Sequence, residues 1–91
     1  MDLKWTSKAQ SDLVRLYEFL EPSNSKSAAQ TVQSLVDAPG RFLDHPRIGE
    51  RLEEFDPREV RRIIIRQYEM RYEIQETTIY VLRIWHTREQ R

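Results

Sequence analysis

The sequence predicts an α+β domain in which two helices pack on one face of a twisted, mainly antiparallel sheet. Apolar side chains recur every three to four residues in the first half of the chain, which is typical of amphipathic helices. After Val60 the period changes to two, which is typical of strands. The 91 residues are enough for one hydrophobic core, so we expect a single domain over residues 1–91. This order of elements favours a helical hairpin on a sheet.

The first elements are predicted to be a short strand and a helix. Residues 2–5 can form the strand, with Leu3 and Trp5 on one face. Thr6 or Ser7 can cap the helix, which should end near residues 21–22, where proline follows glutamate. Its apolar stripe consists of Ala9, Leu13, Leu16, Tyr17 and Leu20. One face of this helix should therefore be buried.

A second helix is expected from Asn24 or Ser25 as far as the Pro39-Gly40 pair, followed by a turn with Phe42 and Leu43. Its apolar side consists of Ala28, Ala29, Val32, Leu35 and Val36. The connection to the first helix is short, so the two helices should form an antiparallel hairpin. Residues 47–58 are rich in charge and are predicted to be a surface connection with a brief strand near Leu52.

Three antiparallel strands are predicted after residue 60, with turns at residues 66–67 and 75–77. In the middle strand, apolar Tyr68, Met70, Tyr72 and Ile74 alternate with charged Glu69, Arg71 and Glu73. This alternation indicates one face in the core and one face in water. Residues 79–85 are apolar on both faces apart from Arg83, so the last strand should be central in the sheet.

Charge is unevenly distributed along the chain. Residues 1–56 hold 7 Lys/Arg and 10 Asp/Glu, a net charge of −3, whereas residues 57–91 hold 8 Arg, no Lys and 5 Glu, a net charge of +3. Arginine stays charged and can bind carboxylate or phosphate through two donors, so the cluster favours a docking surface for an anionic partner. The overall net charge of zero argues against a general nucleic-acid binder.

Composition excludes several kinds of chemistry. The chain has no cysteine, so it forms no disulfide and has no thiolate nucleophile. Its only glycines, Gly40 and Gly49, cannot build a phosphate-binding loop, so we expect no nucleotide or other cofactor. Its two histidines are far apart in the sequence, so we expect no metal site. The N-terminus has no apolar run of the signal-peptide kind and no stretch approaches membrane-spanning length. We therefore expect a cytoplasmic protein with no membrane partner.

The C-terminal residues offer one catalytic hypothesis. RNA cleavage without a metal needs a base, an acid and cations for the phosphorane charge, and His86 with Arg83, Arg88 and Arg91 could supply most of this set. The alternative is that His86 ends a strand and hydrogen-bonds a backbone group while the arginines pair with glutamates. Both interpretations stay open at this point.

Two further groups of side chains have competing interpretations. Arg62 and Arg66 can share a face of the sheet, and with Arg71 on the next strand they would form a basic stripe that either binds a partner or only forms surface ion pairs. Tyr68 and Tyr72 could stack on bases, but they lie on the apolar side of their strand, which favours core packing with the hydroxyls at the rim.

Four segments of the chain, taken in order, resemble the RelE/ParE superfamily of bacterial type II toxins. Residues 5–20 resemble its first strand and helix, and residues 43–52, with a His-Pro pair and a glycine, resemble the loop after its second helix. Residues 60–74 resemble its paired strands, with Tyr68 and Tyr72 in a Y-x-x-x-Y pattern. Residues 79–91 resemble its closing strand and tail. The resemblance covers nearly the whole chain and implies the superfamily's α+β fold.

Within the superfamily the chain is similar to the ParE branch more than to the RelE branch. The position after Tyr68, often arginine in the RNA-cleaving RelE branch, is Glu69, which would repel a phosphate. No lysine follows Lys26, and the chain ends at Arg91 without the extension seen in some RelE-like toxins. Only Arg88 matches a basic residue of the RNA-cleaving set.

The resemblance implies a toxin that inhibits DNA gyrase and is held inactive by a cognate antitoxin. The alternative is a RelE-like interferase that cleaves messenger RNA on the ribosome with His86, Arg83 and Arg88, and a third possibility is an inactive relic or adaptor. The expected target-binding residues are Arg62, Arg66, Arg71, Arg83, His86, Arg88 and Arg91. The antitoxin is expected to contact the two helices at Leu13, Leu16, Tyr17, Leu20, Val32, Leu35 and Val36, and to place acidic residues on some of the arginines.

Overall fold

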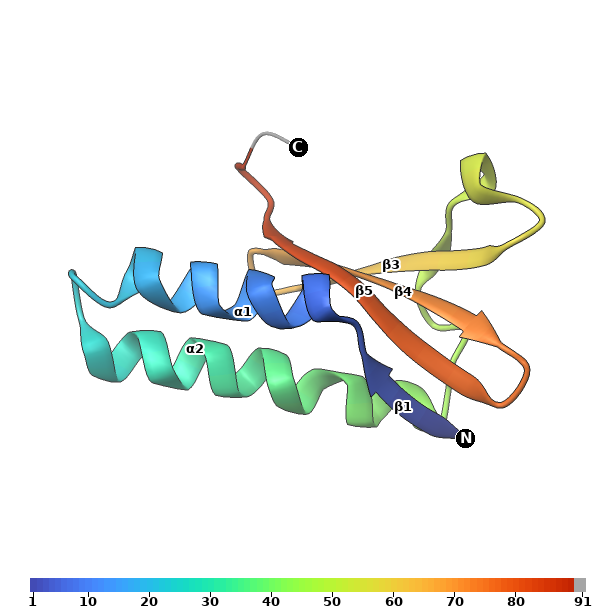
Figure 1. The fold of residues 1–91 in the computed structure, drawn as a ribbon, viewed down its shortest axis with the longest axis horizontal. Coiled ribbons are helices and arrows are strands. Elements are labelled where there is room, and N and C mark those ends of the chain that lie inside the picture. Colours follow the sequence, from blue (N-terminus) through green and yellow to red (C-terminus); the bar gives the residue numbers. More distant parts are fainter. Residues whose placement is uncertain (90–91) are drawn as a thin grey trace.

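A computed structural model describes residues 1–89, and its fold confirms the predicted α+β class. The elements in chain order are β1 (Asp2–Trp5), α1 (Ser7–Leu20), α2 (Ser25–Asp37), the 3₁₀ helix η1 (Ala38–Leu43), β2 (Glu50–Arg51), the 3₁₀ helix η2 (Glu53–Phe55), β3 (Glu59–Ile65), β4 (Tyr68–Gln75) and β5 (Thr78–His86). Figure 1 shows α1 and α2 side by side and antiparallel, packed against the twisted sheet. The spatial strand order is β1-β5-β4-β3-β2, so β5 is internal, as predicted.

The sheet is antiparallel except at one edge. β1 runs parallel to β5, with Asp2 opposite Thr78 and Trp5 opposite Val81. The other neighbouring strands are antiparallel. A parallel pair requires a long crossover, and the helical hairpin with the rest of the sheet supplies it. The first and last strands of the chain therefore lie next to each other.

Both helices begin at the predicted caps. The Thr6 hydroxyl accepts a hydrogen bond from the Ala9 amide at 3.2 Å, and the Asn24 side chain accepts one from the Ser27 amide at 3.0 Å. These side chains satisfy backbone donors that have no partner within a helix. The Thr6 hydroxyl also donates to the Val81 carbonyl at 2.9 Å, so the same residue fixes the start of α1 against β5.

The core lies between the helices and the inner face of the sheet. Helices contribute Ala9, Leu16, Ala28 and Leu35, and strands contribute Tyr68, Met70, Tyr72, Ile74, Ile79, Val81 and Ile84. Side chains at this spacing point to one face of each element, as the sequence predicted. Within residues 1–89, no helix is both long and apolar enough to cross a bilayer.

Tyr72 joins the core to the loop before β2. Its ring is fully buried and stacks on Phe42 with a centroid separation of 4.8 Å. Its hydroxyl donates to the Pro46 carbonyl at 2.8 Å and accepts from the Gly49 amide at 3.0 Å. The hydroxyl is therefore buried under the loop and not at the rim, which corrects part of the expectation for this residue.

The outer face of β4, expected to lie in water, is largely covered. Glu69 and Glu73 have only 1% and 4% of their surface exposed. Arginine side chains from neighbouring segments cover both carboxylates and form ion pairs with them. An alternating pattern specifies which side chains share a face, but it does not specify what covers that face.

Gly49 is predicted to tolerate no side chain. A Cβ at this position would lie 2.7 Å from both the Tyr72 hydroxyl and the Arg62 carbonyl oxygen. We expect Gly49→Ala to lower the free energy of unfolding by about 2 kcal/mol because overpacking forces backbone shifts. Denaturant titration measures the change. Gly40→Ala is the matched control, since a Cβ there meets no atom within 4 Å, and equal stability of the two variants would contradict the prediction.

Candidate functional site

A row of three arginines crosses the outer face of the sheet. Arg62 on β3 is opposite Arg71 on β4, which is opposite Arg83 on β5. Arg62 and Arg71 are two members of the basic stripe expected from the sequence, Arg83 is an additional one, and Arg66, which was expected in the stripe, lies instead in the turn after β3. Like charges directly opposite each other destabilise a sheet, so the row needs compensating carboxylates.

Buried glutamate supplies part of that compensation. Glu69 accepts from Arg71 Nε at 3.0 Å and from Arg62 Nη1 at 3.4 Å, and Arg62 Nε also donates to Glu50 at 2.7 Å. Four residues further along β4, Glu73 accepts two hydrogen bonds from Arg58 at 2.8 and 3.1 Å. A buried carboxylate is tolerated only when it is paired and hydrogen-bonded in this way.

Aromatic rings separate the guanidinium groups. Arg71 lies 4.8 Å from the Trp85 ring centroid and 5.8 Å from that of Phe55. Arg83 lies 5.0 Å from the Trp85 ring centroid, and Arg58 lies 5.9 Å from that of Phe55. Each ring contributes a favourable cation–π interaction and holds its arginine neighbours in place. The outer face is therefore an ordered arginine–aromatic stack.

Asp12 on α1 connects this stack to the edge of β5. β1 pairs with β5 only as far as Val81. Beyond that point, side chains of α1 form hydrogen bonds with the backbone groups at the edge of β5. Asp12 accepts from the Ile84 amide at 2.9 Å and from Arg83 Nε at 2.9 Å, while Arg15 donates to the Ile84 carbonyl at 3.0 Å. The helix thus takes the place of a neighbouring strand.

The protonation of Asp12 follows from these contacts. Burial acts to raise the pKa of its carboxyl, but the hydrogen bonds from Arg83, from the Ile84 amide and from Arg15 together outweigh burial. The pKa of Asp12 therefore lies below its ordinary value, and the carboxylate stays charged at neutral pH.

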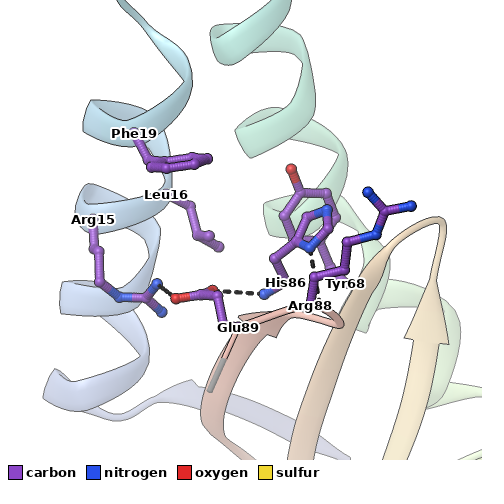
Figure 2. A pocket seen from close by; sticks show the side chains of 7 residues that line it. All are labelled: Arg15, Leu16, Phe19, Tyr68, His86, Arg88 and Glu89. Carbon is purple, nitrogen blue, oxygen red and sulfur yellow. Dashed lines mark hydrogen bonds and ion pairs between the residues drawn. The ribbon is translucent and has the colours of Figure 1, made fainter. Parts of the chain in front are cut away.

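A pocket of about 510 Å³ lies between the C-terminal half of α1 and the ends of β4 and β5. Leu16, Phe19 and Tyr68 form its apolar wall, and Arg15, His86, Arg88 and Glu89 form its polar side. Figure 2 shows Phe19 and Leu16 projecting from the helix towards a space that His86 and Tyr68 bound on the other side. Phe19 is 77% exposed, which is unusual for so large an apolar side chain. The pocket can accept an apolar group next to an anion.

Glu89 closes one side of this pocket. Its carboxylate accepts hydrogen bonds from Arg15 and, at 2.7 Å, from the His86 amide (Figure 2). The hydrogen bond from Arg15 is the main cause that lowers the pKa of Glu89, with burial opposing it. An acidic side chain of this protein therefore already occupies part of the basic rim.

The His86 ring has both nitrogens engaged. The Arg88 amide donates to Nδ1 at 3.1 Å, so Nδ1 carries no proton, and Nε2 lies 3.2 Å from Gln67 Oε1, to which it can donate. The ring also packs edge-on against Tyr68, with a centroid separation of 5.2 Å. In this arrangement no lone pair of His86 is available to accept a proton from a substrate.

The structure divides the expected target-binding residues into three groups. Arg62, Arg71 and Arg83 belong to the outer stack and are ion-paired. His86 and Arg88 line the pocket, and Arg66 lies in the turn between β3 and β4. Arg66 and Arg88 form no side-chain ion pair within residues 1–89. Arg91 lies outside the described residues.

The expected antitoxin-binding residues differ in exposure. Leu16 and Leu35 are buried in the core, and Leu13, Leu20 and Val32 are half-buried. Tyr17 and Val36 are exposed. The expected antitoxin-binding set did not include Val14 and Phe19, which are more exposed than any of its members because they fall outside the buried stripe of α1. A large apolar residue on the polar side of an amphipathic helix is the signal that identifies them.

Comparison with known proteins agrees with the fold. Residues 3–91 match the family described as the ParE toxin of the type II toxin–antitoxin system parDE. The chain belongs to the ParE toxin family. A solved structure of the chromosomal ParDE toxin–antitoxin system from P. aeruginosa is similar, with 25% sequence identity, a TM-score of 0.79, and coverage of 94% of this chain and 95% of that one. A comparison with curated protein sequences finds no match.

The Asp12 contacts predict acid-dependent stability in this ParE family member. Because the folded-state pKa is lowered, the contribution of Asp12 is present above the unfolded value of about 4 and is lost as the pH falls through the folded value. At pH 7, Asp12→Asn should lower the free energy of unfolding by about 3 kcal/mol because Arg83 loses its buried partner.

The comparison is made by denaturant titration at pH 7 and at pH 2.5. The difference between wild type and Asp12→Asn should shrink at the lower pH, because the unfolded chain takes up a proton at Asp12 below about pH 4, before the folded chain does. Asp44→Asn, at an exposed residue, is the control and should leave stability unchanged at both values. A difference that is the same at pH 7 and at pH 2.5 would show that the charge of Asp12 is irrelevant.

Proposed function

We propose that this ParE family member inhibits DNA gyrase by binding to it and is neutralised by a cognate antitoxin. The observation that carries the proposal is the state of His86, whose two ring nitrogens are both engaged within the protein. A ribonuclease without a metal needs a group that can accept a proton, and His86, the candidate for that role, offers no free ring nitrogen in its described arrangement. Family membership favours the same conclusion.

The pocket beside α1 is the surface that we assign to the target. Phe19 offers a large exposed ring and Arg88 offers a cation that has no ion-pair partner within residues 1–89. An aromatic anchor beside an available arginine is the composition typical of binding hot spots. The arginines of the outer stack contribute less in this proposal, because their carboxylate partners belong to the protein itself.

The antitoxin is proposed to bind the exposed apolar side of the helices. Val14, Tyr17, Phe19 and Val36 are exposed, and a segment that folds on binding could bury them. The P. aeruginosa structure is described as a chromosomal ParDE toxin–antitoxin system, which supports a protein partner for this chain as well. The proposal places the protein in the cytoplasm, where it would meet gyrase.

The two partners are proposed to compete for one pocket. Leu16, expected to face the antitoxin, and His86 and Arg88, expected to face the target, line the same cavity. A segment of antitoxin that covers Phe19 would therefore also cover Arg88. Neutralisation would follow from direct occlusion of the target site, without any change in the toxin's fold.

The test is expression of the chain without antitoxin, followed by assays with the purified protein. We expect inhibition of gyrase supercoiling, DNA breaks in cells, intact messenger RNA, and restored growth on co-expression of the cognate antitoxin. Messages cut on ribosomes by the wild-type protein, with normal gyrase activity, would instead establish the RelE-like interferase. Absence of any effect on growth would indicate an inactive relic.

Substitutions in the pocket connect the activity to the site. Phe19→Ala and Arg88→Ala should each weaken gyrase inhibition about tenfold, equivalent to about 1.4 kcal/mol of binding free energy. Both side chains are exposed, so the fold should be retained, which circular dichroism can check. Lys8→Ala removes an exposed cation at the other end of α1 and should inhibit like wild type. Equal potency of all three variants would exclude this pocket as the target site.

A further inference from the structure

Arg15 is held in a fixed position at the rim of the pocket beside α1. Its Nη2 donates to Asp12 Oδ1 at 3.2 Å and to the Ile84 carbonyl at 3.0 Å. Both acceptors belong to the packed structure, since the Asp12 side chain is buried and Ile84 lies in β5. The other terminal nitrogen, Nη1, donates to Glu89 after the end of β5 (Figure 2). One side of the guanidinium is therefore structural, and the other carries a carboxylate at the pocket.

Glu89 reaches Arg15 from a short turn at the end of the described chain. Its backbone amide donates to the His86 carbonyl at 2.9 Å, and its carboxylate accepts from the His86 amide at 2.7 Å. The side chain of Glu89 is 32% exposed and that of Arg15 is 39% exposed. An ion pair exposed to this degree is weak, because water and salt compete with it. A carboxylate from another molecule can therefore replace Glu89 at Arg15.

The space beside this ion pair suits an apolar group. Leu16, Phe19 and Tyr68 line it, and its volume of about 510 Å³ falls in the range of ligand pockets. Arg88 lines the same pocket and forms no ion pair within residues 1–89. The pocket thus offers an apolar wall and two cations, and one of these cations is paired with a carboxylate of the protein itself.

The internal carboxylate indicates the chemistry of the occupant. Glu89 shows that Arg15 accepts a carboxylate carried by a peptide segment. An acidic peptide also carries apolar side chains next to its carboxylates, whereas the phosphates of DNA are attached to polar sugars. The exposed ring of Phe19 needs an apolar partner, so the wall of the pocket favours a protein ligand over nucleic acid.

We infer that the pocket recognises an acidic residue of the target protein together with an adjacent apolar side chain, and that this acidic residue replaces Glu89 at Arg15. In the free protein, Glu89 neutralises Arg15. On docking, the Glu89 side chain turns out to solvent, the incoming carboxylate pairs with Arg15 and Arg88, and the apolar side chain packs on Phe19. The inference deepens the proposed function and rests on it for the identity of the target.

Removal of the internal charge tests the exchange of carboxylates. Glu89→Gln keeps an oxygen that can accept from the His86 amide but removes the charge that pairs with Arg15. In the gyrase supercoiling assay with the purified chain, the variant should inhibit about threefold to fivefold more strongly than wild type, because a weak ion pair no longer competes. Glu76→Gln removes the same charge from the exposed turn at the other end of β4 and β5, and this matched control should inhibit like wild type.

A double-mutant cycle separates recognition by Arg15 from a structural role. Arg15→Gln should weaken inhibition about tenfold, and in that background the gain from Glu89→Gln should fall below about twofold. Asp12 keeps Arg83 and the Ile84 amide as partners, so the fold should survive, which thermal unfolding checks. Weaker inhibition by Arg15→Gln without any gain in Glu89→Gln would show a structural role only and would overturn the inference.

The outcomes also separate this inference from the proposed function. If wild type inhibits gyrase and Glu89→Gln is no more potent than Glu76→Gln, the inference fails and the function stands. If wild type does not inhibit gyrase, the proposed function fails, and the pocket is tested with phenylpropionate, an apolar ring that carries a carboxylate.

The amide chemical shift of His86 reports on this probe, because that amide donates to Glu89. Tighter binding of phenylpropionate than of neutral phenylpropionamide would support the carboxylate site. Equal binding, or no binding, would overturn it. A shift caused by duplex DNA and not by phenylpropionate would assign the pocket to nucleic acid and would overturn the inference as well.

Discussion

Three carboxylates, those of Asp12, Glu69 and Glu73, are buried against the sheet, and each requires positive partners to remain charged there. Arg58, Arg62, Arg71 and Arg83 supply them, and the rings of Phe55 and Trp85 hold three of these arginines, Arg58, Arg71 and Arg83, in a stack. Loss of Arg58 would remove the ion pair of the buried Glu73, and loss of any of the other three would leave a buried carboxylate with one arginine partner instead of two. This requirement ties α1, β3, β4 and β5 together.

The stack changes how the arginine-rich half of the chain relates to function. Counted along the sequence, residues 57–91 carry a net charge of +3 and look like a continuous anion-binding surface. In the fold, much of that charge is satisfied by carboxylates of the same protein. Within residues 1–89, Arg41, Arg66 and Arg88 form no ion pair, and each lines a cavity or lies at a turn. Docking of an anionic partner is therefore concentrated outside the stack.

The pocket beside α1 combines a fixed cation with a replaceable anion. Asp12 and the Ile84 carbonyl hold Arg15 in place, so the position of this guanidinium depends on one of the same buried carboxylates. Glu89 pairs with Arg15 from the short turn after β5. A site whose cation is already in position binds more tightly, because docking does not have to order a long side chain.

The sequence alone determined the class of fold, the helix starts at Thr6 and Asn24 and the central position of β5, because local periodicity and capping chemistry specify them. It also identified Leu16, His86 and Arg88, which line the pocket. It did not reveal the burial of Glu69, the buried hydroxyl of Tyr72, the exposure of Phe19 or the pairing of Glu89 with Arg15. Only the tertiary structure decided these, because each depends on which distant segment covers a given face, and no local pattern encodes that.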